Sequence, residues 1–456
     1  MPVELTEDAL RDALAVAGEW DEDGAHSAHA ALEWMGWEGE GPLLLRRYDV
    51  QLFVWYTLPR KLLTTLDHKR EAADALARTL ERIGGRAASY AELCRSHETE
   101  ELLRAWENED PAAWPQFREL LEGSGLEPPD TDLLAWGQVM GYVEACAREQ
   151  VATALEQAVE DGLLSPGAPG FRRRQAEVAN RALLAPLEGE DGRSRLEAVY
   201  AERLEHWLDR GRTRGSDERS SIIQPIADVM TSQSPTIDLD AARLALAPAL
   251  WLLKLGDDGI ALTQTGALNR ALVREAADRW QGWWNAEIHG PPHRETDVTL
   301  LHELHQLLRR LRLLRCSGRR LVTTARGRKL FADPPALLLA IATDLLAGND
   351  FRAACSELAV ALLLAGFEAD WSEPIARQIQ PAIVAEGWQS DGEPPGVRDV
   401  SWAIADFIRP ATAAGLIERQ RDFPFHREPL VLSAAGRAAL ISGLRARALA
   451  PRKGPY

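Results

Sequence analysis

The chain has 456 residues, which is too long for one simple core and predicts two to four domains. Its hydrophobic content of 46% and charged content of 27% are ordinary for a globular protein, and no run of 18 apolar residues predicts a membrane-spanning helix. The formal net charge of −17 argues against a protein that coats nucleic acid without specificity, because such binding depends on neutralising phosphates with Lys and Arg.

The compartment is indicated by the N-terminus and the cysteines. The first 20 residues lack a basic segment followed by an apolar one, so no secretory signal is predicted. The four cysteines are scattered along the chain without a CxxC pair: Cys94, Cys146, Cys316 and Cys355. Both features are typical of a cytoplasmic protein with reduced thiols.

Residues 1–210 have the pattern of a helical domain. The first 45 residues predict two short helices around an acidic turn, and a long amphipathic helix is expected from Pro59 to Ile83, ended by Gly84. Asp130 is expected to cap a helix at 130–159. Further helices are predicted at 88–106, 111–122, 171–185 and 192–210.

The pattern of predicted elements changes after residue 210. The polar, glycine-interrupted stretch RGRTRGSDERSS predicts a linker at 211–221. Downstream, a helix, two short strands and a second helix recur three times, which predicts winged-helix-like modules at 222–290, 291–350 and 351–456. The turn between the strands of the first module is assigned to GDDG. The expected fold class is therefore mainly α, with an N-terminal helical domain followed by tandem winged-helix-like modules with short β-ribbons.

Each predicted module contains the same four-residue junction, a hydroxyl residue followed by two others and a glycine. The hydroxyl is expected to cap the following helix, and the glycine is expected to let two backbones pack closely. The three pairs are Thr263 with Gly266, Thr324 with Gly327, and Ser433 with Gly436.

Two parts of the chain resemble known families. The junctions TQTG at 263–266 and TARGR at 324–328, together with Arg294-Glu295 and Leu313-Leu314-Arg315, lie in the order found in actinobacterial proteins of the Ri-plasmid open-reading-frame-three-like (resolvase-associated) family. This resemblance covers residues 260–340, and no counterpart of a resolvase serine motif accompanies it. Through GLIERQ and VLSAAGRAAL, residues 398–445 resemble MarR-like or PadR-like winged helices.

One segment of this acidic chain is strongly basic. Residues 301–330 hold nine bases against Glu303 alone. In a winged helix, the helix before the ribbon can enter a major groove, and the ribbon can contact phosphates. The candidate nucleic-acid-binding residues are Arg309, Arg310, Arg312, Arg319, Arg320, Arg326 and Arg328. Alternatively, these arginines pair with the acidic N-terminal domain, whose first 50 residues hold twelve acids against three bases, or bind a protein partner.

The sequence predicts no metal, cofactor or catalytic residue. His302 and His305 are three residues apart, whereas the helical zinc motif HExxH places its histidines four apart. His289 and His293 precede them without a pattern that supplies a further ligand. No phosphate-binding glycine loop, nucleophile elbow or paired-carboxylate motif is present.

The leading hypothesis is a non-enzymatic DNA-binding or regulatory protein that contacts double-stranded DNA through the module at 291–350. The first alternative is a protein-interaction scaffold associated with mobile elements or defence. The second alternative is an enzyme whose site is built from residues distant in sequence.

Overall fold

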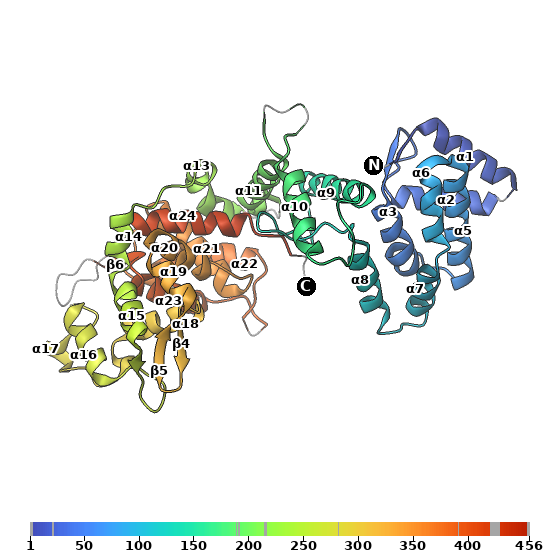
Figure 1. The fold of residues 1–456 in the computed structure, drawn as a ribbon. Helices are drawn as coiled ribbons and strands as arrows, with labels where there is room; N and C mark the ends of the chain where they lie inside the picture. Colours follow the sequence, from blue (N-terminus) through green and yellow to red (C-terminus); the bar gives the residue numbers. More distant parts are fainter. Residues whose placement is uncertain are drawn as a thin grey trace. The chain divides into compact units, whose positions relative to one another are not determined.

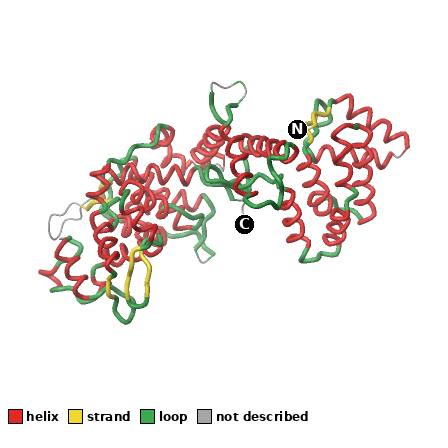
Figure 2. Tube along the Cα trace, viewed as in Figure 1, coloured by secondary structure: helices red, strands yellow, loops and turns green. Residues whose placement is uncertain are grey.

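The computed structural model describes residues 3–20, 22–187, 189, 192–213, 217–280, 282–390, 392–419 and 429–453. The chain is mainly helical with short antiparallel β-ribbons, which confirms the predicted fold class at this level (Figures 1 and 2). None of the described helices combines the length and the apolar character needed to cross a membrane. The chain divides into two compact units: unit 1 comprises residues 1–202 with 451–456, and unit 2 comprises residues 203–450.

Unit 1 is a set of helices preceded by a small strand pair. Its elements are β1 (Val3–Leu5), α1 (Glu7–Trp20), α2 (Glu22–Trp34), β2 (Leu43–Leu45), α3 (Arg47–Leu52), the π-helical turn η1 (Phe53–Thr57), α4 (Leu58–Lys61), α5 (Leu66–Ile83), α6 (Gly85–Cys94), α7 (His97–Glu107), α8 (Ala113–Ser124), α9 (Tyr142–Glu160), α10 (Phe171–Leu184) and the first part of α11 (Arg195–Thr213). β1 and β2 are antiparallel, with Glu4 opposite Leu44. The sequence did not predict this pair.

Three of the helices predicted in unit 1 differ from the expectation. The helix expected at 88–106 is divided into α6 and α7, because the Ser96 side chain accepts a hydrogen bond from the backbone of Thr99 and starts α7 anew. The helix predicted from Pro59 to Ile83 is interrupted, because the Thr65 side chain accepts a hydrogen bond from the backbone of His68 and starts α5 anew. Asp130 caps no helix, and its carboxylate accepts from the backbone of Trp136 at 2.9 Å. The expected helix at 130–159 begins only at Tyr142.

Unit 2 contains the rest of α11 and all the following elements. They are α12 (Asp217–Ile223), the 3₁₀ turn η2 (Gln224–Ile226), α13 (Ala227–Thr231), α14 (Leu239–Ala245), α15 (Ala247–Asp258), β3 (Ile260–Ala261), α16 (Arg270–Arg279), α17 (Ala286–His289), the 3₁₀ turn η3 (Glu295–Asp297), α18 (Thr299–Arg310), β4 (Leu314–Ser317), β5 (Arg320–Thr323), α19 (Ala325–Phe331), α20 (Pro334–Leu345), α21 (Phe351–Leu364), α22 (Ser372–Ala385), α23 (Val397–Ala413), β6 (Ile417–Arg419), β7 (Leu430–Leu432) and α24 (Ala434–Ala448). One hydrophobic core extends from Trp207 to Ala448.

The residues predicted as a linker are helical wherever the structure describes them. α11 continues to Thr213 and α12 begins at Asp217, while residues 214–216 lie outside the described residues. Arg219 and Ser220 are buried in unit 2. The division between the compact units falls earlier, between Glu202 and Arg203, within α11.

A three-stranded sheet joins the first two predicted modules. Its order is β3-β5-β4, all antiparallel, with Ile260 opposite Leu321. The ribbon predicted around GDDG is wrong, because Asp257 and Asp258 end α15 and Gly259 turns the chain into β3 with a φ of 80°. Residues 247–331 thus run helix, strand, three helices (of which α17 is short), two strands and a helix; they are called module A below.

In the described part of the chain, residues 351–448 run helix, helix, helix, strand, strand, helix, which is the order of module A without the strand β3 and the short helix α17; they are called module B. β6 and β7 form its antiparallel ribbon between α23 and α24. The backbone of Leu430 also donates to the carbonyl of Ala369, in the connection between α21 and α22, which is the place that β3 takes in module A. The modules pack on each other through α18 and α23, and α20, which lies between the two modules in the chain, packs against α24.

Two of the three junctions have the predicted capping contact. The Thr324 hydroxyl accepts from the backbone of Gly327 at 3.0 Å, and the Ser433 hydroxyl accepts from that of Gly436 at 2.9 Å. A Cβ built on either glycine would overlap a carbonyl oxygen, that of Leu313 or of Leu416, so close packing requires glycine there.

The third junction was wrongly predicted. α16 is capped by Asn269, whose side chain accepts from the backbone of Leu272 at 3.1 Å. Thr263 instead closes a loop, since its hydroxyl accepts from the backbone of Ala267 at 3.0 Å. Gly266 has a φ of 79° and open space around its Cα, so it serves the turn and not a close approach.

Candidate nucleic-acid interface

Helix α18 separates an apolar face from a polar one. Its leucines at 301, 304, 307 and 308 are buried, which follows from their helical spacing. Gln306, Arg309 and Arg310 are exposed on the remaining face. The helix that precedes the ribbon therefore presents an amide and two guanidinium groups to solvent.

The ribbon β4–β5 carries two arginines on its outer face. Leu314 is opposite Thr323 and Cys316 is opposite Leu321, and three of these four side chains are buried. Because side chains alternate along a strand, the other face of the ribbon holds Arg315, Ser317, Arg320 and Val322. Gly318 and Arg319 form the two-residue turn, where the φ of 60° at Gly318 fits the first position of a type II′ turn.

The end of α18 and the start of α19 are fastened together at Arg312. This residue follows α18 in the left-handed conformation, with a φ of 58°. Its carbonyl accepts from the Thr324 hydroxyl at 2.8 Å, so the helix end lies beside the first turn of α19. Arg326, Arg328 and Lys329 are exposed on α19.

Three of the basic side chains have partners within unit 2. Arg310 pairs with Asp344 at 2.6 Å, and Arg328 pairs with Asp257 at 3.0 Å. Arg320 donates to the carbonyls of residues 258 and 259, both at 2.9 Å. Its guanidinium thus supports the β3 edge of the sheet.

The other basic side chains are exposed, and the described part of the chain offers them neither an ion pair nor a side-chain hydrogen bond. We call them the unpaired cations: Arg309, Arg312, Arg315, Arg319, Arg326 and Lys329. Arg315 and Lys329 were not among the predicted site residues, although their charge was counted in the basic segment. The strand alternation could have indicated Arg315.

The buried carboxylate of Glu295 contacts two histidines of α18. Glu295 is 3% exposed; its oxygens accept from the backbone of Leu268 at 2.6 Å and lie 2.8 Å from His305 Nδ1 and 3.2 Å from His302 Nδ1. Burial opposes ionisation, but the contacts with His305, Leu268 and His302 hold the pKa of Glu295 below its ordinary value. The cluster ties the loop before α16 and the turn η3 to α18.

The histidines thus have a structural contact that sequence spacing missed. The acid that they contact is Glu295, seven residues before His302, and not the neighbouring Glu303. Among the residues that the structure describes, no group of three or more His, Cys, Asp or Glu side chains has a metal-binding arrangement.

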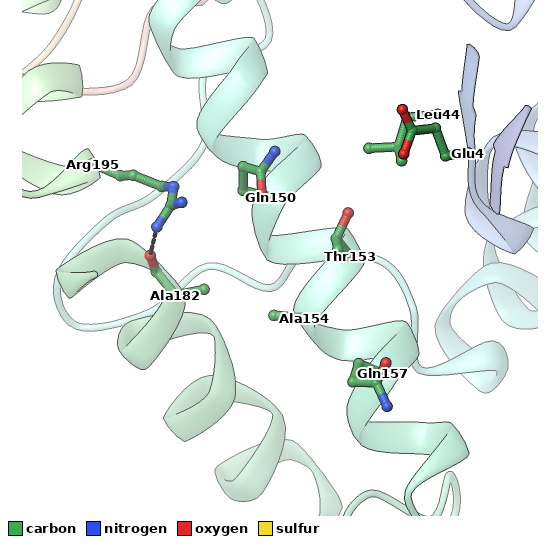
Figure 3. A pocket seen from close by; sticks show the side chains of 8 residues that line it. All are labelled: Glu4, Leu44, Gln150, Thr153, Ala154, Gln157, Ala182 and Arg195. Carbon is green, nitrogen blue, oxygen red and sulfur yellow. Dashed lines mark hydrogen bonds between the residues drawn. The ribbon is translucent and has the colours of Figure 1, made fainter. Parts of the chain in front are cut away.

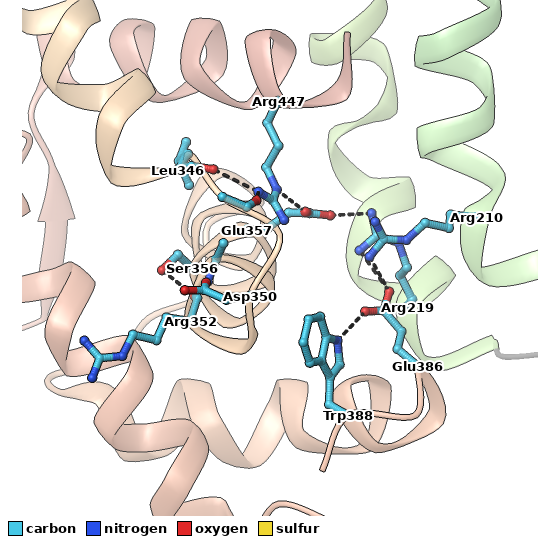
Figure 4. A network of polar contacts seen from close by, with 12 residues as sticks. Arg210, Arg219, Leu346, Asp350, Arg352, Ser356, Glu357, Glu386, Trp388 and Arg447 are labelled. Atoms are coloured by element: carbon cyan, nitrogen blue, oxygen red, sulfur yellow. Dashed lines mark hydrogen bonds and ion pairs between the residues drawn. The ribbon is translucent and has the colours of Figure 1, made fainter. Parts of the chain in front are cut away.

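A second polar cluster lies deep in unit 2 (Figure 4). Glu357 is fully buried and accepts from Arg219 at 2.5 Å and from Arg447. Glu386 accepts from Arg210 at 2.7 Å. Burial opposes ionisation of Glu357, but the nearby arginines 219, 210 and 447 hold its pKa well below the ordinary range. Because each charge is paired, this cluster fastens α11 and α12 to α21, α22 and α24.

Unit 1 has a hollow of about 650 Å³ between the β1–β2 pair and α9 (Figure 3). Its lining residues are Glu4, Leu44, Gln150, Thr153, Ala154, Gln157, Ala182 and Arg195. Arg195 donates to the Ala182 carbonyl at 3.3 Å. No ion pair is formed between Glu4 and Arg195, so the hollow lacks a coupled acid and base, and we assign no chemistry to it.

Module A is a small domain of helices and a β-ribbon, and its outer face is basic. Residues 244–336, which span it, match the family model described as the Y4jL N-terminal domain. The uncharacterized protein y4jL of Sinorhizobium fredii (strain NBRC 101917 / NGR234) is 38% identical over 92 residues, which are 19% of this chain and 42% of that protein. The chain therefore matches less than half of this relative's length. No solved structure matches the chain.

Proposed function

We propose that this protein binds double-stranded DNA through module A, which has the element order of a winged helix, and acts as a DNA-binding regulatory protein. The observation that carries the proposal is the set of unpaired cations. Acids outnumber bases by 69 to 52 in this chain, so counter-ions are plentiful. Six exposed cations without counter-ions on one helix–ribbon–helix surface are best explained by an external polyanion.

The placement of these cations suits a duplex. In winged helices the helix before the ribbon enters the major groove, and the ribbon lies along the backbone. α18 corresponds to that helix, with Gln306 and Arg309 available for base edges, and the ribbon supplies Arg315 and Arg319 for phosphates. The resemblances to Ri-plasmid open-reading-frame-three-like and MarR-like or PadR-like proteins stay predictions.

The test is a salt titration of binding to a labelled duplex of random sequence. Four to six phosphate contacts give a log–log slope of about −4 to −5. Replacing Arg315 and Arg319 by Ala is expected to weaken binding and to flatten the slope by about 2, because each lost contact removes about 0.9. Stability should change by less than about 1 kcal/mol, because both side chains are exposed.

The control is the double variant Arg173→Ala and Arg377→Ala, which removes two exposed charges from other helices and should leave the slope unchanged. Absence of binding at about 50 mM salt, where nonspecific contacts register, would contradict the proposal. The protein-interaction scaffold, with its association with mobile elements or defence, would then be the better hypothesis.

A further inference from the structure

The junction between the ribbon and the following helix is held by the same hydrogen bonds in modules A and B. In module A, the backbone of Thr324 donates to the Leu313 carbonyl at 2.9 Å, and the Thr324 hydroxyl donates to the Arg312 carbonyl at 2.8 Å. These bonds join the strand that leaves the ribbon to the end of α18.

Module B has the same two bonds. The backbone of Ser433 donates to the Leu416 carbonyl at 3.1 Å, and the Ser433 hydroxyl donates to the Gly415 carbonyl at 2.8 Å. Gly415 of module B therefore occupies the place that Arg312 occupies in module A.

This shared place requires the left-handed conformation. Both helices end with the same bond, from Leu313 to Leu308 in module A and from Leu416 to Ala411 in module B, each 2.9 Å long. The residue before the donor has a φ of 58° in module A and 74° in module B. This helix ending favours glycine, because a Cβ crowds the neighbouring carbonyl in this region. Module B has glycine here, where a Cβ would also overlap the carbonyl of Ala245, whereas module A carries an arginine.

The backbone of Arg312 serves the fold, but nothing in the described fold requires an arginine side chain there. Its side chain is exposed, and no described residue forms an ion pair or a hydrogen bond with it. Apart from Arg312, the described chain holds one non-glycine residue with positive φ, Glu109 in unit 1. Strain of this kind tends to occur where a residue is needed for function.

The correspondence extends to the other cations. Counting along the chain from the matched bonds, module B has Thr412 in the place of Arg309, Glu418 in the place of Arg315, and Ala435 in the place of Arg326. These three of the six unpaired cations are replaced by residues that carry no positive charge, while the ribbon turn of module B, which would correspond to Arg319, lies outside the described residues.

Arg328, which has a partner within module A, has an arginine counterpart in module B. Arg328, which contacts Asp257 within module A, corresponds to Arg437, which donates to the Leu364 carbonyl within module B at 2.9 Å. The arginine with an internal partner is thus present in both modules, whereas the places of Arg309, Arg312, Arg315 and Arg326 hold no arginine in the described part of module B.

We propose that unit 2 contains an internal duplication in which the helix end before the ribbon contacts the nucleic-acid backbone in module A and not in module B, with Arg312 kept against backbone strain as a central phosphate-binding residue. This inference rests on the proposed function. Arg312 lies between Arg309 at the end of α18 and Arg315 on the ribbon, and its carbonyl is bonded to the residue that caps α19. It is therefore where the helix, ribbon and α19 parts of the basic surface meet. Helix α23 of module B packs against α18 and so supports module A.

The test uses the full chain, a labelled 24-base-pair duplex of random sequence and two variants at one position. Arg312→Gly removes both the charge and the strain, so its unfolding midpoint in urea is expected to rise while duplex binding weakens several-fold. The log–log salt slope is expected to flatten by about 0.9. Arg312→Lys keeps the charge and the strain, and its slope and unfolding midpoint are expected to match those of the unchanged chain.

The matched control lies on the corresponding helix of module B. Arg398 and Arg409 are exposed on α23, and replacing both by Ala is expected to leave the slope unchanged. A flattened slope in this control would overturn the restriction to module A. Equal binding by Arg312→Gly and the unchanged chain would overturn the role of Arg312 while leaving the proposed function intact. Absence of binding by the unchanged chain would instead reject the proposed function.

Discussion

The carboxylate of Glu357 has two arginine partners and no access to solvent. Removing one member of a buried ion cluster leaves the opposite charges uncompensated, which is strongly destabilising. We expect Glu357→Gln to lower the free energy of unfolding of unit 2 by about 3–5 kcal/mol. The measurement is urea denaturation followed by tryptophan fluorescence, since Trp207 lies beneath Arg219 in the same cluster.

The control for this prediction is a partly exposed carboxylate in the same unit. Glu373 pairs with Arg377 at 2.6 Å on the surface of α22. Glu373→Gln should change the stability by less than about 1 kcal/mol, because exposed pairs contribute little. Equal effects of the two substitutions would show that the Glu357 cluster contributes no more than a surface pair.

The same carboxylate predicts how stability depends on pH. Its pKa is lowered in the folded chain, so the unfolded chain binds the proton more tightly. The stabilisation is therefore fully present above the unfolded pKa, about 4.3, and is lost as the pH falls below it toward the folded pKa. Urea midpoints between about pH 7 and pH 3 should fall more steeply for the unchanged chain than for Glu357→Gln. Parallel curves would contradict the assignment.

At the scale of elements, the three glycine junctions differ in what glycine provides. A Cβ at Gly327 or Gly436 would meet a carbonyl oxygen of the strand–helix connection, whereas Gly266 lies in open space at positive φ. Gly327→Ala and Gly436→Ala should therefore each destabilise the chain by about 1–3 kcal/mol through overpacking. Gly266→Ala should cost about 1 kcal/mol through its backbone conformation alone. Chemical denaturation gives the order, and a larger loss at Gly266 would contradict it.

The short strands show why element pairing could not be read from the pattern. A turn signal such as GDDG fits both a hairpin and the end of a helix, because Gly and Asp favour either setting. The outcome depended on Ile260, which pairs with Leu321 from sixty residues later in the chain. Local sequence preferences do not predict which distant strand a short strand will pair with.

At the scale of the whole molecule, α11 contributes to the core of unit 2 well before the predicted module start at residue 222. Trp207 is buried in that core, and Arg210 and Arg219 contact the acids of α21 and α22. A fragment of residues 222–450 lacks all three side chains and leaves the buried carboxylate of Glu357 without Arg219.

We therefore expect the fragment of residues 203–450 to unfold cooperatively and the fragment of residues 222–450 to melt at a markedly lower temperature. Circular dichroism and calorimetry of both fragments measure this difference. Equal melting temperatures would show that residues 203–221, which include the predicted linker at 211–221, add nothing to the stability of unit 2.

The sequence by itself determined the helical class, the basic segment and two of the three junctions. These features depend on contacts close in the chain: the leucine spacing of α18, the cap at Thr324 and the clustering of arginines after residue 308. Local spacing and composition are sufficient for such features, because the partners are at most one or two turns apart.

Only the tertiary structure decided which of these arginines are unpaired, that modules A and B are two copies and not three, and that Arg312 stands where module B has Gly415. Asp257 and Asp344, which pair with Arg328 and Arg310, lie 71 and 34 residues away from them. Charge in the sequence says how many cations a segment has. Which of them remain available to a partner depends on the long-range packing that brings acids to some of them and leaves the others exposed.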